Sequence, residues 1–246
     1  KEWYKLFQDG KLKDIQSQFF KPRLPESLFD IEKDPYETNN LASLNEHKKT
    51  LLELRESLNS HVISQPDLSF LPEPYFLENG LENGVDFGQK NKELIKSLVQ
   101  TANLNLSPYN EVRSEILEAL NSENAWIRYW GLIVCSSFGK EASEHLDKIN
   151  IIFDNDLENL VKIRAAEYLL LNNYKIDSSK ISDLLKGANS ESEANLMLNT
   201  LALIKTQQPT YKLDLKKEVF PKDWLPPIRS DNALVNRRMN YLTNNE

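Results

Sequence analysis

Apolar residues recur at helical spacing from Leu94 to Lys205, and successive segments alternate between two patterns. Residues 125–135 are apolar almost all round, whereas the segment before them carries a one-sided stripe of Val112, Ile116, Leu117 and Leu120. A one-sided stripe is typical of a helix with one face in solvent, and an all-round apolar helix is usually buried. The sequence therefore predicts covering helices that alternate with core helices. The alternation recurs in Leu146, Ile149, Ile152 and Phe153 before residues 160–171, and in Ile181, Leu184 and Leu185 before residues 196–204.

The predicted core helices begin with similar residues at regular intervals. Arg128 aligns with Arg164 at an interval of 36 residues, and Arg164 aligns with Asn195 at an interval of 31. These intervals fit two-helix units, and the Ile-Arg opening of the core helix resembles HEAT repeats. About three such hairpins would form an α-solenoid over residues 91–206, and a homo-oligomer through the repeats is left open. The two arginines predict a ladder of contacts with Asp or Asn of a neighbouring turn, with ligand binding as the alternative.

Proline-rich segments flank the predicted repeats. Residues 64–90 contain Pro66, Pro72 and Pro74 together with many apolar residues, which predicts a connector packed across a surface rather than a free linker. Residues 207–246 contain four prolines around Trp224, followed by a predicted helix over residues 231–242. An indole beside a proline pair usually docks into a surface. The tail is therefore predicted to cap the repeats or to act as a strap.

Residues 26–42 predict a short strand followed by a turn. Phe29 and Ile31 would share one face of an extended segment. Pro35 presets φ and has no amide hydrogen, so Asp34-Pro35 predicts a turn that ends the strand. A single strand cannot satisfy its own backbone hydrogen bonds. We therefore expect its partner strands to lie upstream of this chain.

A helix is predicted on each side of this strand. Residues 2–8 predict a helix that ends near Gly10. Ser43 and Glu46 have the spacing of a capping box for a second helix. That helix would be amphipathic, because Leu44, Leu51, Leu54, Leu58 and Val62 follow at helical spacing.

Residues 28–42 resemble the near-C-terminal signature of the sulfatase family. The family signature contains Leu-Tyr-Asp-Leu, an Asp-Pro turn and Asn-Leu-Ala; this chain has Leu-Phe-Asp-Ile, Asp-Pro-Tyr-Glu and Asn-Asn-Leu-Ala. Residues 3–22 also resemble bacterial sulfatases among the relatives of heparan N-sulfatase, in which helical repeats follow the enzyme. The resemblance implies that residues 1–63 are the end of an α+β subdomain, one strand plus a helix, which leans on a catalytic domain. The expected fold class is therefore mainly α, with this subdomain end followed by the helical repeats.

The resemblance also implies an upstream sulfatase catalytic domain that hydrolyses sulfate esters or sulfamates, on a sulfated carbohydrate. Such domains use a formylglycine made from Cys or Ser in Cys/Ser-x-Pro-x-Arg and a divalent metal, usually calcium. Neither is present here: Cys135 is followed by no such Pro or Arg, and Ser64 has Pro66 but Leu68 where Arg is needed. We expect no catalytic residue, cofactor or metal in this segment. The family implies a periplasmic or extracellular location.

Lys21 and Arg23 are the candidate substrate-binding residues. They form a basic cluster beside Phe19 and Phe20, just before the signature. The C-terminal subdomain of sulfatases contributes to the rim of the substrate pocket, so the resemblance implies that these residues could contact a sulfated sugar. The structural alternative is a proline-stiffened strap with an aromatic anchor. It is preferred because these positions match no binding motif of the family.

Other groups that could carry chemistry have simpler interpretations. Asp30 and Asp34 are better explained by local hydrogen bonds than as a catalytic carboxylate pair. Residues 154–158 hint at a calcium loop but lack its later Gly and Glu, so an acidic start to a helix is favoured. Cys135 lies on an apolar core helix and is predicted to be buried. His47, His61 and His145 lack the spacing of zinc ligands and are predicted at surface or cap positions.

Composition excludes some classes of protein. The 246 residues are 40% hydrophobic, which is enough to build a core, and the net charge is -7. An acidic chain of this kind is not expected to bind nucleic acid, and no apolar run reaches the length of a membrane span. The main hypothesis is a sulfatase C-terminal region, and the alternative is a freestanding HEAT-type interaction scaffold. A helical carbohydrate-binding module is a third hypothesis.

Overall fold

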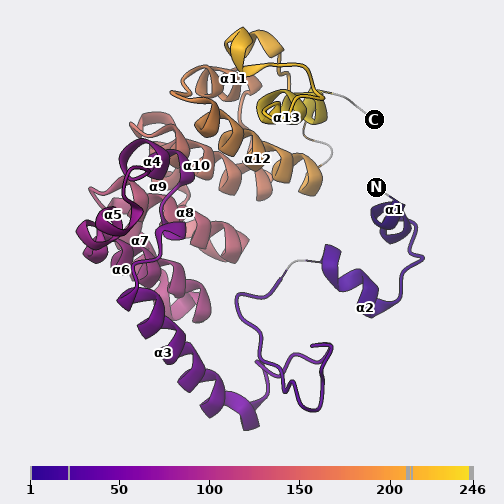
Figure 1. Cartoon of the computed structure of the whole chain (residues 1–246), viewed down its shortest axis with the longest axis vertical. Helices are drawn as coiled ribbons and strands as arrows, with labels where there is room; N and C mark the ends of the chain where they lie inside the picture. The colour runs from indigo at the N-terminus through magenta and orange to yellow at the C-terminus, as the bar shows by residue number, and fades with distance from the viewer. Residues whose placement is uncertain (1, 22, 209–210, 212, 244–246) are drawn as a thin grey trace. The chain divides into compact units, whose positions relative to one another are not determined.

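The computed structural model describes residues 2–21, 23–208, 211 and 213–243 (Figure 1). Over these residues the chain is mainly helical and has no β-strand, which confirms the mainly α class. The chain divides into two compact units, unit 1 (Lys1–Val62) and unit 2 (Ile63–Glu246). No helix in the described ranges is long and apolar enough to cross a membrane. The predicted roles of Pro22 and Pro209 lie outside the described residues.

Unit 1 is helical but has almost no interior. Its helices are α1 (Glu2–Gln8), α2 (Asp14–Ser17) and α3 (Lys48–Ser64), with 3₁₀ turns η1 (Gln18–Phe20) and η2 (Asn45–His47). The predicted helix over residues 2–8 is confirmed. Among the described residues of unit 1, Ser17 is the only one that is buried. The apolar face predicted for α3 is therefore not packed within this unit.

The predicted strand at residues 28–31 is wrong. Residues 28–30 have no regular structure, and Ile31 begins a turn with its side chain exposed. The backbone of Leu28 is paired within the loop instead: its N–H donates to Asn40 Oδ1 at 3.0 Å, and its carbonyl accepts from Leu41 N–H at 2.8 Å. A strand needs a neighbouring strand to satisfy its backbone groups, whereas Leu28 pairs both of its backbone groups within its own loop.

The predicted capping box at Ser43 and Glu46 is also wrong. α3 begins at Lys48, after the 3₁₀ turn η2, so Glu46 precedes the helix. Ser43 lies in a turn that is closed by a hydrogen bond from Leu44 N–H to the Leu41 carbonyl at 3.0 Å. The turn places Ser43 too far from the first helical amides to cap them.

The segment predicted as a connector contains helices of its own. It forms η3 (Leu68–Phe70), α4 (Glu73–Asn79) and α5 (Gly84–Lys90). The segment packs on the rest of unit 2, because Leu71 is buried and Trp130 Nε1 donates to the Phe70 carbonyl at 2.8 Å. Within the segment, Gly80 lets the Phe87 ring approach closely, since a Cβ there would meet that ring at 2.6 Å.

Unit 2 continues as a series of packed helices. Figure 1 shows α8, α10 and α12 in succession, and α10 contacts both of its neighbours. α7 packs on α8, while α9 and α11 pack on α10, so covering helices alternate with core helices as the apolar pattern predicts. The assignment to HEAT repeats stays a prediction. The bounds are α6 (Lys92–Asn103), α7 (Tyr109–Asn121), α8 (Ala125–Phe138), α9 (Leu146–Asn155), α10 (Asn159–Leu171), α11 (Ser178–Lys186) and α12 (Glu191–Gln207).

The core of unit 2 is close-packed at the α7–α8 contact. A Cβ on Gly131 would lie 3.1 Å from Ala119 Cβ, so the absence of a side chain lets the two helices approach. Gly139 ends α8 with φ of 59°, the left-handed conformation that glycine adopts without strain. The largest fully buried side chains of the described residues are Tyr168, Ile95, Leu98, Ile116, Leu120, Leu132, Ile149, Ile163, Leu169, Ile181, Leu185 and Met197.

The tail ends in α13 (Leu234–Thr243), which packs against α12. Lys205 Nζ joins the two helices by donating to the carbonyl of Tyr241 at 2.7 Å. Two 3₁₀ turns, η6 (Lys217–Val219) and η7 (Lys222–Trp224), precede α13. Trp224 is half-buried beside the buried Phe220, with ring centroids 6.1 Å apart.

Candidate functional site

The sulfatase-like signature forms a loop organised by Asp34. Its Oδ2 accepts from the N–H groups of Thr38 and Asn39, both at 2.7 Å, and its Oδ1 accepts from Thr38 Oγ1 at 3.0 Å. The hydrogen bond from the Asn39 amide is the main cause that holds the pKa of Asp34 below its ordinary value. Glu37 has φ of 51°, so the chain turns back on itself inside this loop.

Asp30 and Asn40 secure the two sides of the same loop. Lys33 donates to Asp30 through its Nζ at 2.8 Å and through its backbone N–H at 3.2 Å, and the side-chain contact lowers the pKa of Asp30. Asn40 Oδ1 accepts from the N–H of Ala42 at 3.0 Å as well as from Leu28. The expectation that Asp30 and Asp34 serve local hydrogen bonding is confirmed. Sequence reasoning missed Asn40, whose signal was an Asn within a run of turn-forming residues.

The candidate residues Lys21 and Arg23 lie at the surface of unit 1. Both side chains are exposed, and neither has a hydrogen bond or ion pair to any described residue. The aromatic anchor beside them does assemble: the Trp3 ring lies 4.8 Å from Phe19 and 4.7 Å from Phe20. This cluster is not buried, since Phe19 is 59% exposed. A role for Lys21 and Arg23 in substrate binding stays a prediction.

Arg128 confirms the predicted contact with a neighbouring turn. Its Nε and Nη2 donate to the two carboxylate oxygens of Asp156 at 2.6 and 2.9 Å, and its Nη1 donates to the Ser122 and Glu123 carbonyls at 2.8 and 2.9 Å. Asp156 Oδ1 also accepts from the N–H of Glu158 at 3.0 Å. Asp154, which accepts from Lys180 Nζ at 2.7 Å, and Asp156 are thus both engaged in structural contacts. In the described part of the chain, no group of three His, Cys, Asp or Glu residues is placed to hold a metal ion.

Arg164 departs from this pattern. It donates to Glu167 of its own helix at 2.5 Å and to the Tyr129 hydroxyl of the preceding hairpin at 2.8 Å. Its guanidinium also lies over the Tyr129 ring, 4.9 Å from the centroid. The predicted Asp or Asn partner is wrong for this arginine, because the corresponding turn has no carboxylate and its Asn189 donates to Glu193 instead.

Cys135 and His145 are both buried in unit 2. Burial raises the pKa of the Cys135 thiol to about 12, so it stays protonated and unreactive, as predicted. His145 occupies the N-cap position of α9, one of the two positions predicted for it, but it is buried, and burial lowers its pKa. The Tyr109 hydroxyl contacts both His145 and Glu144. It lies 3.2 Å from His145 Nε2 and donates to Glu144 at 2.6 Å.

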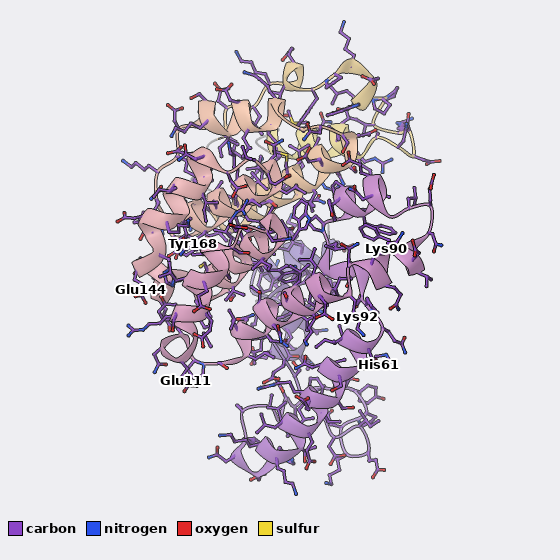
Figure 2. The ribbon with its side chains drawn as sticks, turned by 90° about the vertical axis from the view of Figure 1, so that its left-hand side faces the viewer. His61, Lys90, Lys92, Glu111, Glu144 and Tyr168 are labelled. Carbon is purple, nitrogen blue, oxygen red and sulfur yellow. The ribbon has the colours of Figure 1, made fainter. Side chains whose placement is uncertain are left out.

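Tyr168 has a buried polar group that no hydrogen bond satisfies. The side chain is labelled in Figure 2, is fully buried, and has a hydroxyl with no partner among the described residues. Burial raises its pKa above the ordinary value. The hydroxyl therefore remains neutral, and it forms no site with Cys135 that could act as a nucleophile and base.

One comparison with known proteins finds a partial sequence match. The chain is 39% identical, over 84 residues, to an ulvan-active sulfatase from Formosa agariphila. Over this part the chain is similar to a sulfatase. The matched residues are 34% of this chain but span only 14% of the relative's length. No family model and no solved structure matches the chain.

Proposed function

We propose that this chain is the C-terminal portion of a sulfatase whose parent enzyme hydrolyses sulfate esters or sulfamates of a sulfated carbohydrate. The observation that carries the proposal is the 39% identity to an ulvan-active sulfatase over 84 residues. The self-contained loop around Asp34 and Asn40 supports it, because the residues that resemble the family signature have structural partners rather than free reactive groups. This segment completes a subdomain, and the catalytic domain lies upstream. An exported location is part of the same proposal.

The packing of unit 1 supports a role in completing another domain. A unit of this size is normally stable only when it buries a large share of its apolar surface, yet the described residues of unit 1 bury only Ser17. Trp3, Phe19 and Tyr36 are among its exposed large apolar side chains. Exposed aromatic groups of this kind mark a surface that another domain covers. In this proposal the upstream catalytic domain covers them.

The catalytic groups of a sulfatase do not fit the residues of this chain. Cys135 lacks the Pro and Arg that formylglycine formation requires, and its thiol is buried. The carboxylates of the described residues do not gather into a metal site. We therefore assign formylglycine and calcium to the upstream domain and derive no catalytic step from this segment.

The proposal is tested by comparing the full gene product with residues 1–246 alone. Both are assayed on an aryl sulfate and on a sulfated polysaccharide such as ulvan. Turnover is expected for the full product and not for the segment. Turnover by the isolated segment, or a preceding coding region without a Cys/Ser-x-Pro-x-Arg motif, would refute the proposal.

A freestanding helical-repeat scaffold is the second candidate. It is favoured by unit 2, in which α8, α10 and α12 share a core made by residues of this chain alone. Under this alternative unit 1 is only a cap. An upstream sequence that encodes no hydrolase domain would favour the scaffold.

A further inference from the structure

Unit 2 contains a groove that the proposed function does not use. It lies between α4 and the N-terminal ends of α8, α10 and α12, and has a volume of about 740 Å³. This volume is in the range of pockets that bind small molecules or short peptide segments. The groove is built within a single unit, because α4 contacts α12 and α10 contacts both α8 and α12. Its shape is therefore fixed by the core helices.

All the ionisable carboxylate side chains that line the groove are glutamates, and the lining contains no basic side chain. Glu78, Glu123, Glu158 and Glu193 contribute four carboxylates, and the lining contains no Lys, Arg or His. Arg128 lies outside this lining, where both carboxylate oxygens of Asp156 engage it, and it offsets only part of the charge by lowering the pKa of Glu158. The groove therefore presents an excess of negative charge.

Glu193 and Glu158 are the inner carboxylates of the groove. Glu193 is only 5% exposed; its Oε2 accepts from Asn189 N–H at 2.6 Å and from Asn189 Nδ2 at 3.1 Å, while Oε1 has no partner among the described residues. The half-buried Glu158 has no side-chain hydrogen bond or ion pair to any described residue. Its pKa is raised by burial first, and then by Glu193 and Asp156. Each inner carboxylate thus has acceptor capacity that the protein does not use.

Helix dipoles explain only part of this arrangement. Carboxylates at the start of a helix are stabilised by the partial positive charge there, which accounts for Glu158 and Glu193 at α10 and α12. Glu78 lies instead in the last turn of α4, where the dipole disfavours a negative charge, and it adds to the causes that raise the pKa of Glu158. The position of Glu78 shows that favourable helix dipoles do not account for all the negative charge in the groove.

Aromatic rings form one wall of the groove. Tyr75 and Trp126 both line it, and their ring centroids are 4.9 Å apart. The face of an indole or phenol ring attracts an ammonium or guanidinium group, and Trp gives the strongest attraction. Aromatic faces beside carboxylates therefore match an organic cation with an apolar stem, such as a Lys or Arg side chain.

The spacing of the carboxylates favours an organic cation over a metal ion as the ligand. Within the described residues, no three acidic groups converge as metal ligands. A sulfated sugar would be repelled by the four carboxylates. We propose that this groove binds a basic segment of a polypeptide, with a Lys or Arg side chain held by Glu158 and Glu193 against Trp126.

The test is a fluorescence anisotropy titration of the 246-residue chain with a fluorescein-labelled peptide, Gly-Arg-Gly-Lys-Gly-Arg-Gly. Saturable binding is expected for this peptide but not for the same peptide with Gln in place of Arg and Lys. Glu158→Gln removes one carboxylate without removing any hydrogen bond of the described structure, so the fold is retained. This variant is expected to weaken binding about tenfold, the loss typical of a hydrogen bond to a charged group.

Glu118→Gln is the matched control, because it makes the same charge change on an exposed position of α7 outside the groove. Its affinity should equal that of the unmodified chain. Equal weakening by both variants would mean attraction to net charge alone and would overturn the proposal. Stronger binding of free spermine than of the peptide would also overturn it.

Discussion

Replacing Asp156 with alanine would leave the guanidinium of Arg128 without its counter-ion. The side chain of Asp156 is 3% exposed and that of Arg128 is 16% exposed, so water cannot take over the lost contacts. Three hydrogen bonds to Asp156 disappear, at 2.6, 2.9 and 3.0 Å. Arg128 keeps its two backbone carbonyl acceptors, Ser122 and Glu123.

The expected cost follows from this burial. Breaking a buried ion pair by removing one partner typically costs 3–5 kcal/mol, and the two remaining carbonyl contacts place this site at the lower end, at about 3 kcal/mol. For a domain of this size each kcal/mol lowers Tm by roughly 3 °C, so Asp156→Ala should lower it by about 9 °C. Arg128→Met removes the cation as well. The double variant Asp156→Ala/Arg128→Met is therefore expected to lose less unfolding free energy than the two single variants lose together. The difference should be about 2 kcal/mol.

The measurement is urea unfolding of the full chain followed by circular dichroism. Asp183→Ala is the control, because Asp183 pairs with Lys186 at 2.8 Å on the surface, with side chains 71% and 58% exposed. Exposed pairs contribute about 0–1 kcal/mol. The argument that burial makes this ion pair strongly stabilising would be refuted if Asp156→Ala lowered the free energy of unfolding by less than about 1 kcal/mol, or by no more than the control does.

Three further outcomes are expected. Burial raises the pKa of Glu158 above its ordinary value, so its ionised form destabilises the folded state as pH rises through the folded pKa. Glu158→Gln should therefore increase the free energy of unfolding at about pH 7 but not below about pH 4, as urea titrations at both values would show. Gly131→Leu should destabilise unit 2 by about 2 kcal/mol in thermal melts, because even a Cβ would lie 3.1 Å from Ala119 Cβ, whereas an unchanged melt would mean that α7 can move away. Asp34→Ala should speed amide hydrogen exchange at Thr38 and leave exchange in unit 2 unchanged; protection at Thr38 that persists would show that Asp34 does not hold the loop.

The helical part of the fold could be predicted because its signals are local. The all-round apolar pattern of residues 125–135 identified a core helix, and Gly139 marked its end. The contact of Arg128 with a neighbouring turn was also predictable, since equivalent positions of successive hairpins face the same loops. These features depend on periodicity and on nearby residues, which a single sequence contains.

The predictions that failed depend on contacts between distant residues. The segment at residues 28–31 has strand-like alternation, but the N–H of Leu28 donates to Asn40 across the loop instead of to a strand. His145 was expected at a surface or cap position; it caps α9, but its burial beside Tyr109 of another helix was not foreseen. The acidic groove could not be predicted, because Glu78 and Glu158 come together only through the packing of α4 against the core helices. No local pattern in the sequence encodes such convergence.

The scarcity of buried side chains in unit 1 also affects how this chain would respond to heat. The enthalpy and heat-capacity change of unfolding scale with the surface that becomes exposed, and residues 2–62 have little left to expose. A calorimetric transition of the chain should therefore correspond to residues 63–246 rather than to the whole length. Residues 1–62 would contribute to that transition only once a covering surface had given them an interior.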